Sequence, residues 1–299
     1  MNSAQNNVRV VRTAAVHEAN AMSARSTTDS DSHVSHVAHT PQVRLQCIDV
    51  IRGICCISMV VFHACFIAQE LFGVPLDWFS GVLQQLWRAH IAWSFLFIAG
   101  MMCAFTHHMY KRIACYGVTA ALIWLVSSSP YVDLPISYGI IFCMCASTIL
   151  AAILQTCSIR FAHYGWVAVF ICAFVLTVHV PEGVFGAGGF TLSLPSQLYT
   201  TNSFAFLGFC SHTFESWDYY PLVPFSFLYL AGYAFAHTRK AGTKPLEKTA
   251  LEQLCVRLVS TSRIWRAVST IGKRTLFVYV LHPVCIYAAG SAIRALLIR

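Results

Sequence analysis

The stretch that decides the fold is residues 48–63, IDVIRGICCISMVVFH. It begins with Asp49 and Arg52, continues through apolar residues, and ends on His63. An apolar segment that enters a bilayer normally lacks charged residues, because an ionisable side chain is costly in hydrocarbon. A helix rises 1.5 Å per residue, so His63 is expected about 16 Å along the helix from Arg52. The stretch therefore predicts a membrane helix with an ion pair near one end and an imidazole past its middle.

The composition places the whole chain among membrane proteins. Of its 299 residues, 57% are hydrophobic and only 11% are charged, whereas a soluble domain carries about 25% charged residues. Lipid offers the backbone no hydrogen bonds, so each span should be a helix. We therefore expect an all-α integral membrane protein.

Seven segments are apolar enough to cross a bilayer, which takes roughly 20 residues. They are residues 51–71, 89–106, 113–129, 136–157, 164–180, 219–236 and 275–292. An outer loop is expected at 181–218, where glycine and proline interrupt the chain, and a basic cytoplasmic loop at 237–274. Residues 1–44 are polar, lack the apolar core of a signal peptide and predict a disordered cytoplasmic tail. The membrane domain is then 45–299.

The distribution of basic residues orients these spans, because Lys and Arg gather in cytoplasmic loops. With the N-terminus inside, 17 of the 20 basic residues lie on the cytoplasmic side, and only Arg88, Arg294 and Arg299 lie outside. The net charge of +8 is then a topology signal, and no nucleic-acid partner is expected. The sequence predicts a multi-pass protein of the cell (inner) membrane, with the C-terminus outside and the lipid bilayer as its first partner.

The cysteines and histidines do not form a metal-binding pattern. The 13 cysteines are scattered, most of them within spans, where they act as small apolar residues. No C-x-x-C pair occurs, so structural zinc is not expected. The tail histidines, as in HVSHVAH at residues 33–39, are interpreted as part of a solvated segment. We expect no metal.

The polar residues inside or beside the spans are the functional candidates, because ionisable groups at membrane depth are rare and costly. They are Asp49, Arg52, His63, His90, His179, Asp218 and His282, with Arg88 at the outer rim. Each has a structural alternative: Asp49 and Arg52 can anchor a helix end, and a membrane histidine can simply bond a neighbouring carbonyl. His282 precedes Pro283, which frees a carbonyl one turn earlier.

Four ordered blocks between Asp49 and Pro283 carry a resemblance to a known family. They are the D-x-x-R-G opening of residues 48–63, WRAHIAWSFLFIAGMMCAF at 87–105, LGFCSHTFESWDYYPLVPFSFLYLAGY at 207–233, and VSTIGKRTLFVYVLHPV at 268–284. In combination they resemble the heparan-α-glucosaminide N-acetyltransferase catalytic-domain-like family of membrane acyltransferases. The first block alone also resembles the broader membrane O-acyltransferases.

The resemblance implies transfer of an acyl group, with acetyl expected, from cytosolic acyl-CoA to an outward-facing sugar or glycan acceptor. It implies donor binding by Asp49, Arg52, Lys273, Arg274 and Thr275, and acceptor binding by Arg88, Tyr219 and Tyr220. We take His63, His90, His282 and Asp218 as the candidates for catalysis. Arginine suits donor binding because its guanidinium can bind phosphate oxygens in pairs. An imidazole suits a general base near neutral pH.

The sequence departs from the lysosomal relatives at the proposed base. In those relatives span one ends on an asparagine, and the histidine assigned to catalysis lies in the following loop. Here that loop, residues 71–87, contains no histidine, so His63 is taken as its substitute.

Other classes of function stay open. His63, His179 and His282 could ligate haem, although their expected depths differ: outer half, outer end and inner half. A transporter is disfavoured because the two halves show no inverted repeat. A non-catalytic member of the family and a homo-oligomer are also compatible with the sequence.

Overall fold

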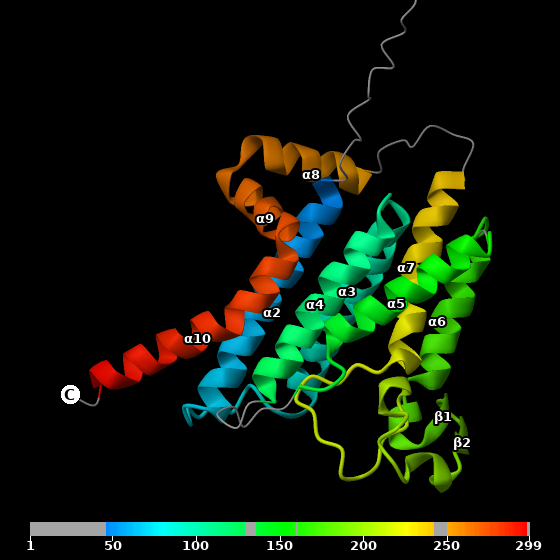
Figure 1. Cartoon of the computed structure of the whole chain (residues 1–299). Helices are drawn as coiled ribbons and strands as arrows, with labels where there is room; N and C mark the ends of the chain where they lie inside the picture. Colours follow the sequence, from blue (N-terminus) through cyan, green and yellow to red (C-terminus); the bar gives the residue numbers. More distant parts are fainter. Residues whose placement is uncertain (1–45, 129–135, 160, 242–249, 298–299) are drawn as a thin grey trace, which may run out of the picture. The chain divides into compact units, whose positions relative to one another are not determined.

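The structure of the chain is a computed structural model that describes residues 46–128, 136–159, 161–241 and 250–297 (Figure 1). The expected tail, 1–44, lies outside these residues. The described chain is mostly helical, as predicted, but it also contains one two-stranded sheet. The expectation of an all-α protein is corrected to that extent.

Seven helices correspond to the seven expected spans. They are α2 (Gln46–Glu70), α3 (Gly81–Ala104), α4 (Met109–Ser127), α5 (Ile140–Thr156), α6 (Gly165–Thr177), α7 (Leu222–Ala241) and α10 (Thr275–Leu297). Among the described residues, five stretches are long and apolar enough to cross a membrane: α2, α3, α4, α10, and α6 together with the turn that follows it. Helix α5 is apolar but has 17 residues, and α7 ends in a polar turn that includes His237, Arg239 and Lys240. The structure therefore supports a multi-pass membrane protein.

Both regions expected as loops contain regular elements. Residues 181–218 include the antiparallel hairpin of β1 (Val184–Ala187) and β2 (Phe190–Ser193), closed by the pair of Ala187 with Phe190. Three short 3-10 helices lie in the same region: η1 (Val180–Glu182), η2 (Ser196–Tyr199) and η3 (Ala205–Leu207). The basic region includes α8 (Ala250–Thr261) and α9 (Arg263–Lys273), which lie beside the start of α2 (Figure 1). Helix α9 is amphipathic: Arg263 and Arg266 are exposed, whereas Val268 is buried.

Helices α3 and α7 pack through a reciprocal pair of glycines. Gly100 of α3 lies against the backbone carbonyl of Tyr229, and Gly232 of α7 lies against the backbone carbonyl of Phe97. A Cβ atom at either glycine would overlap that carbonyl. Tyr229 is fully buried, and its hydroxyl shares a 2.8 Å hydrogen bond with Thr148 of α5. Helix α7 is therefore the central helix against which α3 and α5 are fixed.

Helices α2 and α9 approach each other in the same way. Gly53 of α2 lies against the backbone of Val268, and Gly272 of α9 lies against the backbone of Asp49. Both glycines belong to the sequence blocks described above, and each is needed because the other helix leaves no room for a side chain.

This crossing sets where α10 begins relative to α2. The side chain of Thr275, the first residue of α10, lies close to that of Cys56, well inside α2. Each helix then continues for seven residues to a histidine, His63 or His282, and the two rings lie in contact. The expectation that His63 and His282 lie at different depths was wrong, because it placed the start of α10 level with the start of α2.

Candidate functional site

One cavity of about 1180 Å³ extends along most of α2. Its lining includes α2 from Arg52 to Ile67, which is about 22 Å of helix. On α3 the lining runs from Gln84 to Met102, and the chain before α7 contributes Ser216 to Pro221. The cavity thus joins the first turns of α2 and α4 to the segment that precedes α7.

One end of this cavity is basic, and Arg52 is its first residue. The Arg52 Nη1 atom lies 4.0 Å from Oδ1 of Asp49, whose side chain is buried. Asp49 therefore holds the guanidinium at the cavity wall, as the sequence predicted for a paired acid and base on one helix face.

Arg112 of α4 is the second arginine at this end, and sequence reasoning had placed it at the inner surface. Its Nη2 donates a 2.8 Å hydrogen bond to the Ala99 carbonyl, and its guanidinium lies 5.2 Å from the Tyr116 ring centroid. Its Nε is buried and has no hydrogen-bond partner. Arg52 and Arg112 are close enough for their charges to repel. With Asp49 near only one of them, this end of the cavity is suited to an anion.

Of the other residues expected to bind the donor, one lines the cavity and two do not. Thr275 lines the cavity and donates a 2.7 Å hydrogen bond to the Gly272 carbonyl. Lys273 and Arg274 are exposed and do not line the cavity.

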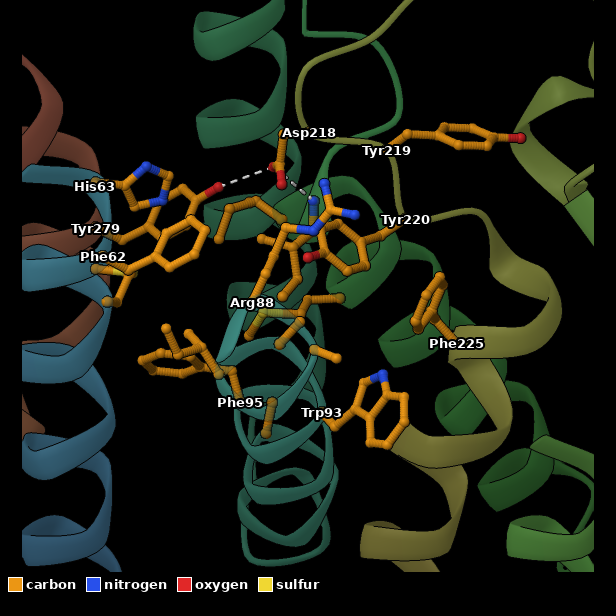
Figure 2. Close-up of a pocket in the computed structure, with 18 of the residues that line it drawn as sticks. Phe62, His63, Arg88, Trp93, Phe95, Asp218, Tyr219, Tyr220, Phe225 and Tyr279 are labelled. Atoms are coloured by element: carbon orange, nitrogen blue, oxygen red, sulfur yellow. Dashed lines mark hydrogen bonds between the residues drawn. The ribbon is translucent and has the colours of Figure 1, made fainter. Parts of the chain in front are cut away.

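Asp218 lies at the other end of the cavity. Its Oδ2 accepts hydrogen bonds from the Ile140 backbone N–H, in the first turn of α5, and from the Tyr279 hydroxyl of α10, both at 3.1 Å (Figure 2). Burial raises the pKa of the Asp218 carboxyl above its ordinary value, whereas the two donors and the charge of Arg88 oppose that rise. Gly139 is necessary here, because a Cβ at that position would meet Oδ2 at 2.6 Å.

Arg88 and an aromatic wall complete this end. Figure 2 shows the Arg88 side chain extending from α3 towards Asp218 and Tyr220, with Trp93 and Phe225 nearby; all of them line the cavity. Tyr219 points away from Asp218 (Figure 2), and its hydroxyl donates to the Ala205 carbonyl at 2.6 Å. All three expected acceptor-binding residues, Arg88, Tyr219 and Tyr220, therefore line the cavity, but the Tyr219 hydroxyl is already bonded within the loop.

Some of the candidate histidines likewise line the cavity, and others do not. His63 lines the cavity, and its ring centroid lies 4.7 Å from that of His282, which is buried behind it. His90 is exposed on α3 and does not line the cavity. His179 lines the cavity and pairs at 2.9 Å with Glu182.

The histidine geometry also bears on metal and haem binding. The rings of His63 and His282 touch each other, so a planar macrocycle does not fit between them. Within the described residues, no group of three or more His, Cys, Asp or Glu is placed to hold a metal ion.

The sequence model of one family, described as "Heparan-alpha-glucosaminide N-acetyltransferase, catalytic", matches residues 44–284. The chain belongs to this family. The match confirms the resemblance seen in the four sequence blocks, and it covers α2 to the middle of α10. No curated protein and no solved structure matches the chain.

For this heparan-α-glucosaminide N-acetyltransferase family member, two cavity residues were missed by sequence reasoning. Arg112 looked like one of two adjacent surface cations, and only its position on the same helix face as Tyr116 distinguishes it from Lys111. Tyr279 lies between the recognised Thr275 and His282 at one-turn spacing, so the helical period could have suggested it.

Proposed function

We propose that this protein transfers an acyl group, with acetyl expected, from cytosolic acyl-CoA to a sugar or glycan acceptor on the outer side of the membrane. The observation that carries this proposal is one continuous cavity: Arg52 and Arg112 line one end, whereas Asp218, aromatic rings and His63 line the part around Tyr279. The family of the chain supports the reaction class.

We propose seven spans in the cell (inner) membrane, with the N-terminus inside and the C-terminus outside. The charge count of 17 basic residues to three supports this orientation. Arg52 and Arg112 then face the cytosol, where acyl-CoA is made, and Asp218 faces outwards. Reporter fusions after Lys248 and Ala187 should report opposite sides of the membrane; the same side for both would contradict this topology.

The basic end is suited to the phosphates of the donor. Arg52 and Arg112 approach from α2 and α4 and could bind neighbouring phosphate oxygens, each through two N–H groups. Part of Arg112 is already engaged by Ala99, so its orientation is fixed before the donor binds. The pantetheine arm would follow the apolar wall of the cavity, which includes Met59 and Phe95, towards His63.

The opposite end is suited to a polar acceptor with an apolar face. Such sites combine aromatic walls with a few fixed polar groups that set orientation. Trp93, Tyr220 and Phe225 supply the wall, while Asp218 and Arg88 supply an acceptor and a donor of hydrogen bonds. This combination fits a sugar, whose hydroxyl groups and C–H face require both.

His63 would act as the general base. Its free ring nitrogen takes the proton of the acceptor hydroxyl or amine while the acceptor atom attacks the thioester carbonyl carbon. The new C–O or C–N bond forms, the C–S bond breaks, and the imidazolium returns its proton to the CoA thiolate. The histidine is thus regenerated and no further reactant is needed.

The test follows radiolabel from acetyl-CoA into the outer glycan fraction of membranes that contain the protein. His63→Gln should bind acyl-CoA normally yet lose at least about a hundredfold in transfer, because an amide does not accept a proton at neutral pH. Wild-type turnover should fall as pH drops through the imidazole pKa. His163→Gln is the matched control, since His163 is exposed in the chain before α6.

Near-wild-type transfer by the His63→Gln protein would remove His63 from the mechanism. Uptake of labelled acceptor into proteoliposomes without acyl-CoA would favour a transporter instead, and a haem absorption band in the purified protein would favour electron transfer.

A further inference from the structure

His282 is a buried ionisable group next to the reaction cavity, and the proposed mechanism does not use it. Its Nδ1–H donates to the Val278 carbonyl at 3.2 Å, and the Tyr279 carbonyl also interacts with the ring. The Tyr279 carbonyl has no helical partner because residue 283 is proline. This arrangement places the proton of the neutral ring on Nδ1, so Nε2 is left as a hydrogen-bond acceptor.

Among the described residues, no group donates a hydrogen bond to this Nε2 acceptor. The Nε2 atom of His282 is buried and has no hydrogen-bond partner, which is uncommon for a polar atom in a protein interior. The only ring placed to meet it from α2 is that of His63, whose centroid lies 4.7 Å away with a tilt of 51°. No hydrogen bond joins the two rings here. The contact distance of the rings leaves a reorientation of the His63 ring as the movement needed to form one, and catalytic hydrogen bonds often tighten only with substrate bound.

We propose that His282 is the positioning residue for His63. Its Nε2 accepts a hydrogen bond from one ring N–H of His63, which fixes the tautomer of His63 and leaves the other nitrogen unprotonated towards the cavity. When His63 takes the acceptor's proton, the same bond stabilises the imidazolium until that proton passes to the CoA thiolate. The arrangement resembles a catalytic triad, in which a third group orients the base that activates the nucleophile. Here His63 is the base and His282 is the group that orients it. This inference rests on the proposed function.

The surroundings of the pair favour this role over simple packing. A histidine that only filled space would not leave one nitrogen unpaired in a buried place, because an unpaired buried polar atom costs free energy. The neighbouring groups that titrate or carry charge are Tyr279 on α10, Asp218, which is bonded to the Tyr279 hydroxyl, and Arg88 on α3. The hydroxyl of Tyr279 is engaged by Asp218, so His63 is the partner left for Nε2.

Two substitutions at residue 282 separate the possible roles. His282→Gln keeps an amide that can donate to Val278 and accept from His63, but it removes the ring. His282→Phe keeps the ring contact but removes both the Nδ1–H donor to Val278 and the Nε2 acceptor. If His282 positions His63, the Gln variant should keep kcat within a few-fold of wild type, and the Phe variant should lose about ten- to a hundredfold in kcat.

Both variants should bind labelled acetyl-CoA as wild type does, because Arg52 and Arg112 are untouched; this measurement also checks folding. An active Phe variant with an impaired Gln variant would show a packing role. Equal inactivation of both, with donor binding intact, would make His282 itself the base. Either result would overturn the proposal.

A spectroscopic measurement on the unmodified protein keeps the proposal testable if a variant fails to fold. The ¹⁵N signals of labelled histidines, with His63 and His282 assigned by substitution of each, should show His282 neutral with its proton on Nδ1 and His63 in one tautomer. A proton on Nε2 of His282 would overturn the inference. If His63→Gln remains active, the proposed function loses its base; if His63→Gln is inactive and His282→Phe is active, only this inference fails.

Discussion

Replacement of Arg112 by glutamine tests the donor end of the cavity. One of its N–H groups is bonded to Ala99, so Nε and the remaining N–H groups are left for a phosphate. A hydrogen bond to a charged group contributes about 1.5–3 kcal/mol. Arg112→Gln should therefore weaken acyl-CoA binding about ten- to a hundredfold, whereas a residue that only anchors α4 would leave donor affinity unchanged.

The assay is equilibrium binding of labelled acetyl-CoA to the purified protein, with Lys111→Gln as the control. Lys111 is adjacent in the sequence and exposed, so its replacement removes the same charge without altering the cavity. Its affinity for acyl-CoA should change less than about twofold, since exposed charges contribute little. Equal losses in the two variants would show that net charge, rather than the cavity, governs binding and would refute the reasoning.

The same reasoning extends to Arg52. Arg52→Lys keeps the charge but cannot bind two phosphate oxygens at once, so donor affinity should still fall about tenfold or more. If Arg52 and Arg112 share one phosphate group, the double variant should lose less than the sum of the single losses. Additive losses would assign the two arginines to separate phosphates.

Two further predictions concern Asp218 and the glycine of the first block. The raised pKa of Asp218 means that its favourable contribution to stability is present at low pH and is lost as pH rises from about 3.9 through the folded value. Asp218→Asn, which cannot ionise, should therefore show a smaller fall in Tm between about pH 4.5 and about pH 7.5; an unchanged fall, or an equal effect of the exposed Asp77→Asn, would contradict this. Gly53→Ala should lower Tm, because overpacking against Val268 costs about 1–3 kcal/mol. Gly117→Ala, whose Cβ would make only an ordinary 3.6 Å contact with the Cys145 sulfur, should raise Tm or leave it unchanged, and equal behaviour of the two would refute the close contact.

Much of the architecture could be predicted, because a bilayer requires an apolar composition and apolar segments long enough to cross it. The helices near residues 51–71 and 275–292 follow directly from the requirement that a backbone in lipid be helical. The basic region 237–274 was read as a loop because its charges masked the amphipathic period of α9, whose apolar side meets α2 and not the bilayer core. The hairpin of β1 and β2 was missed because four-residue strands give too short a pattern.

The candidate site could be predicted only where its residues lie on one helix. Asp49, Arg52 and His63 share α2, so their spacing was readable from the sequence, and the structure places Arg52 and His63 on one cavity. The contact of His63 with His282 depends on how deeply α10 begins, which is a tertiary quantity fixed by the α2–α9 crossing. Whether a histidine such as His90 faces the cavity or the exterior likewise depends on the rotation of α3.

The reciprocal contact of Gly53 with Val268 and of Gly272 with Asp49 has a consequence for chain length. These contacts fix the position of α9 against α2. Ten residues after Gly272, the ring of His282 contacts the ring of His63. One residue inserted between Gly272 and His282 would turn the imidazole by about 100° and advance it by about 1.5 Å. The segment from Gly272 to His282 therefore tolerates changes of side chain far better than changes of length, and it acts as a molecular spacer between the two histidines.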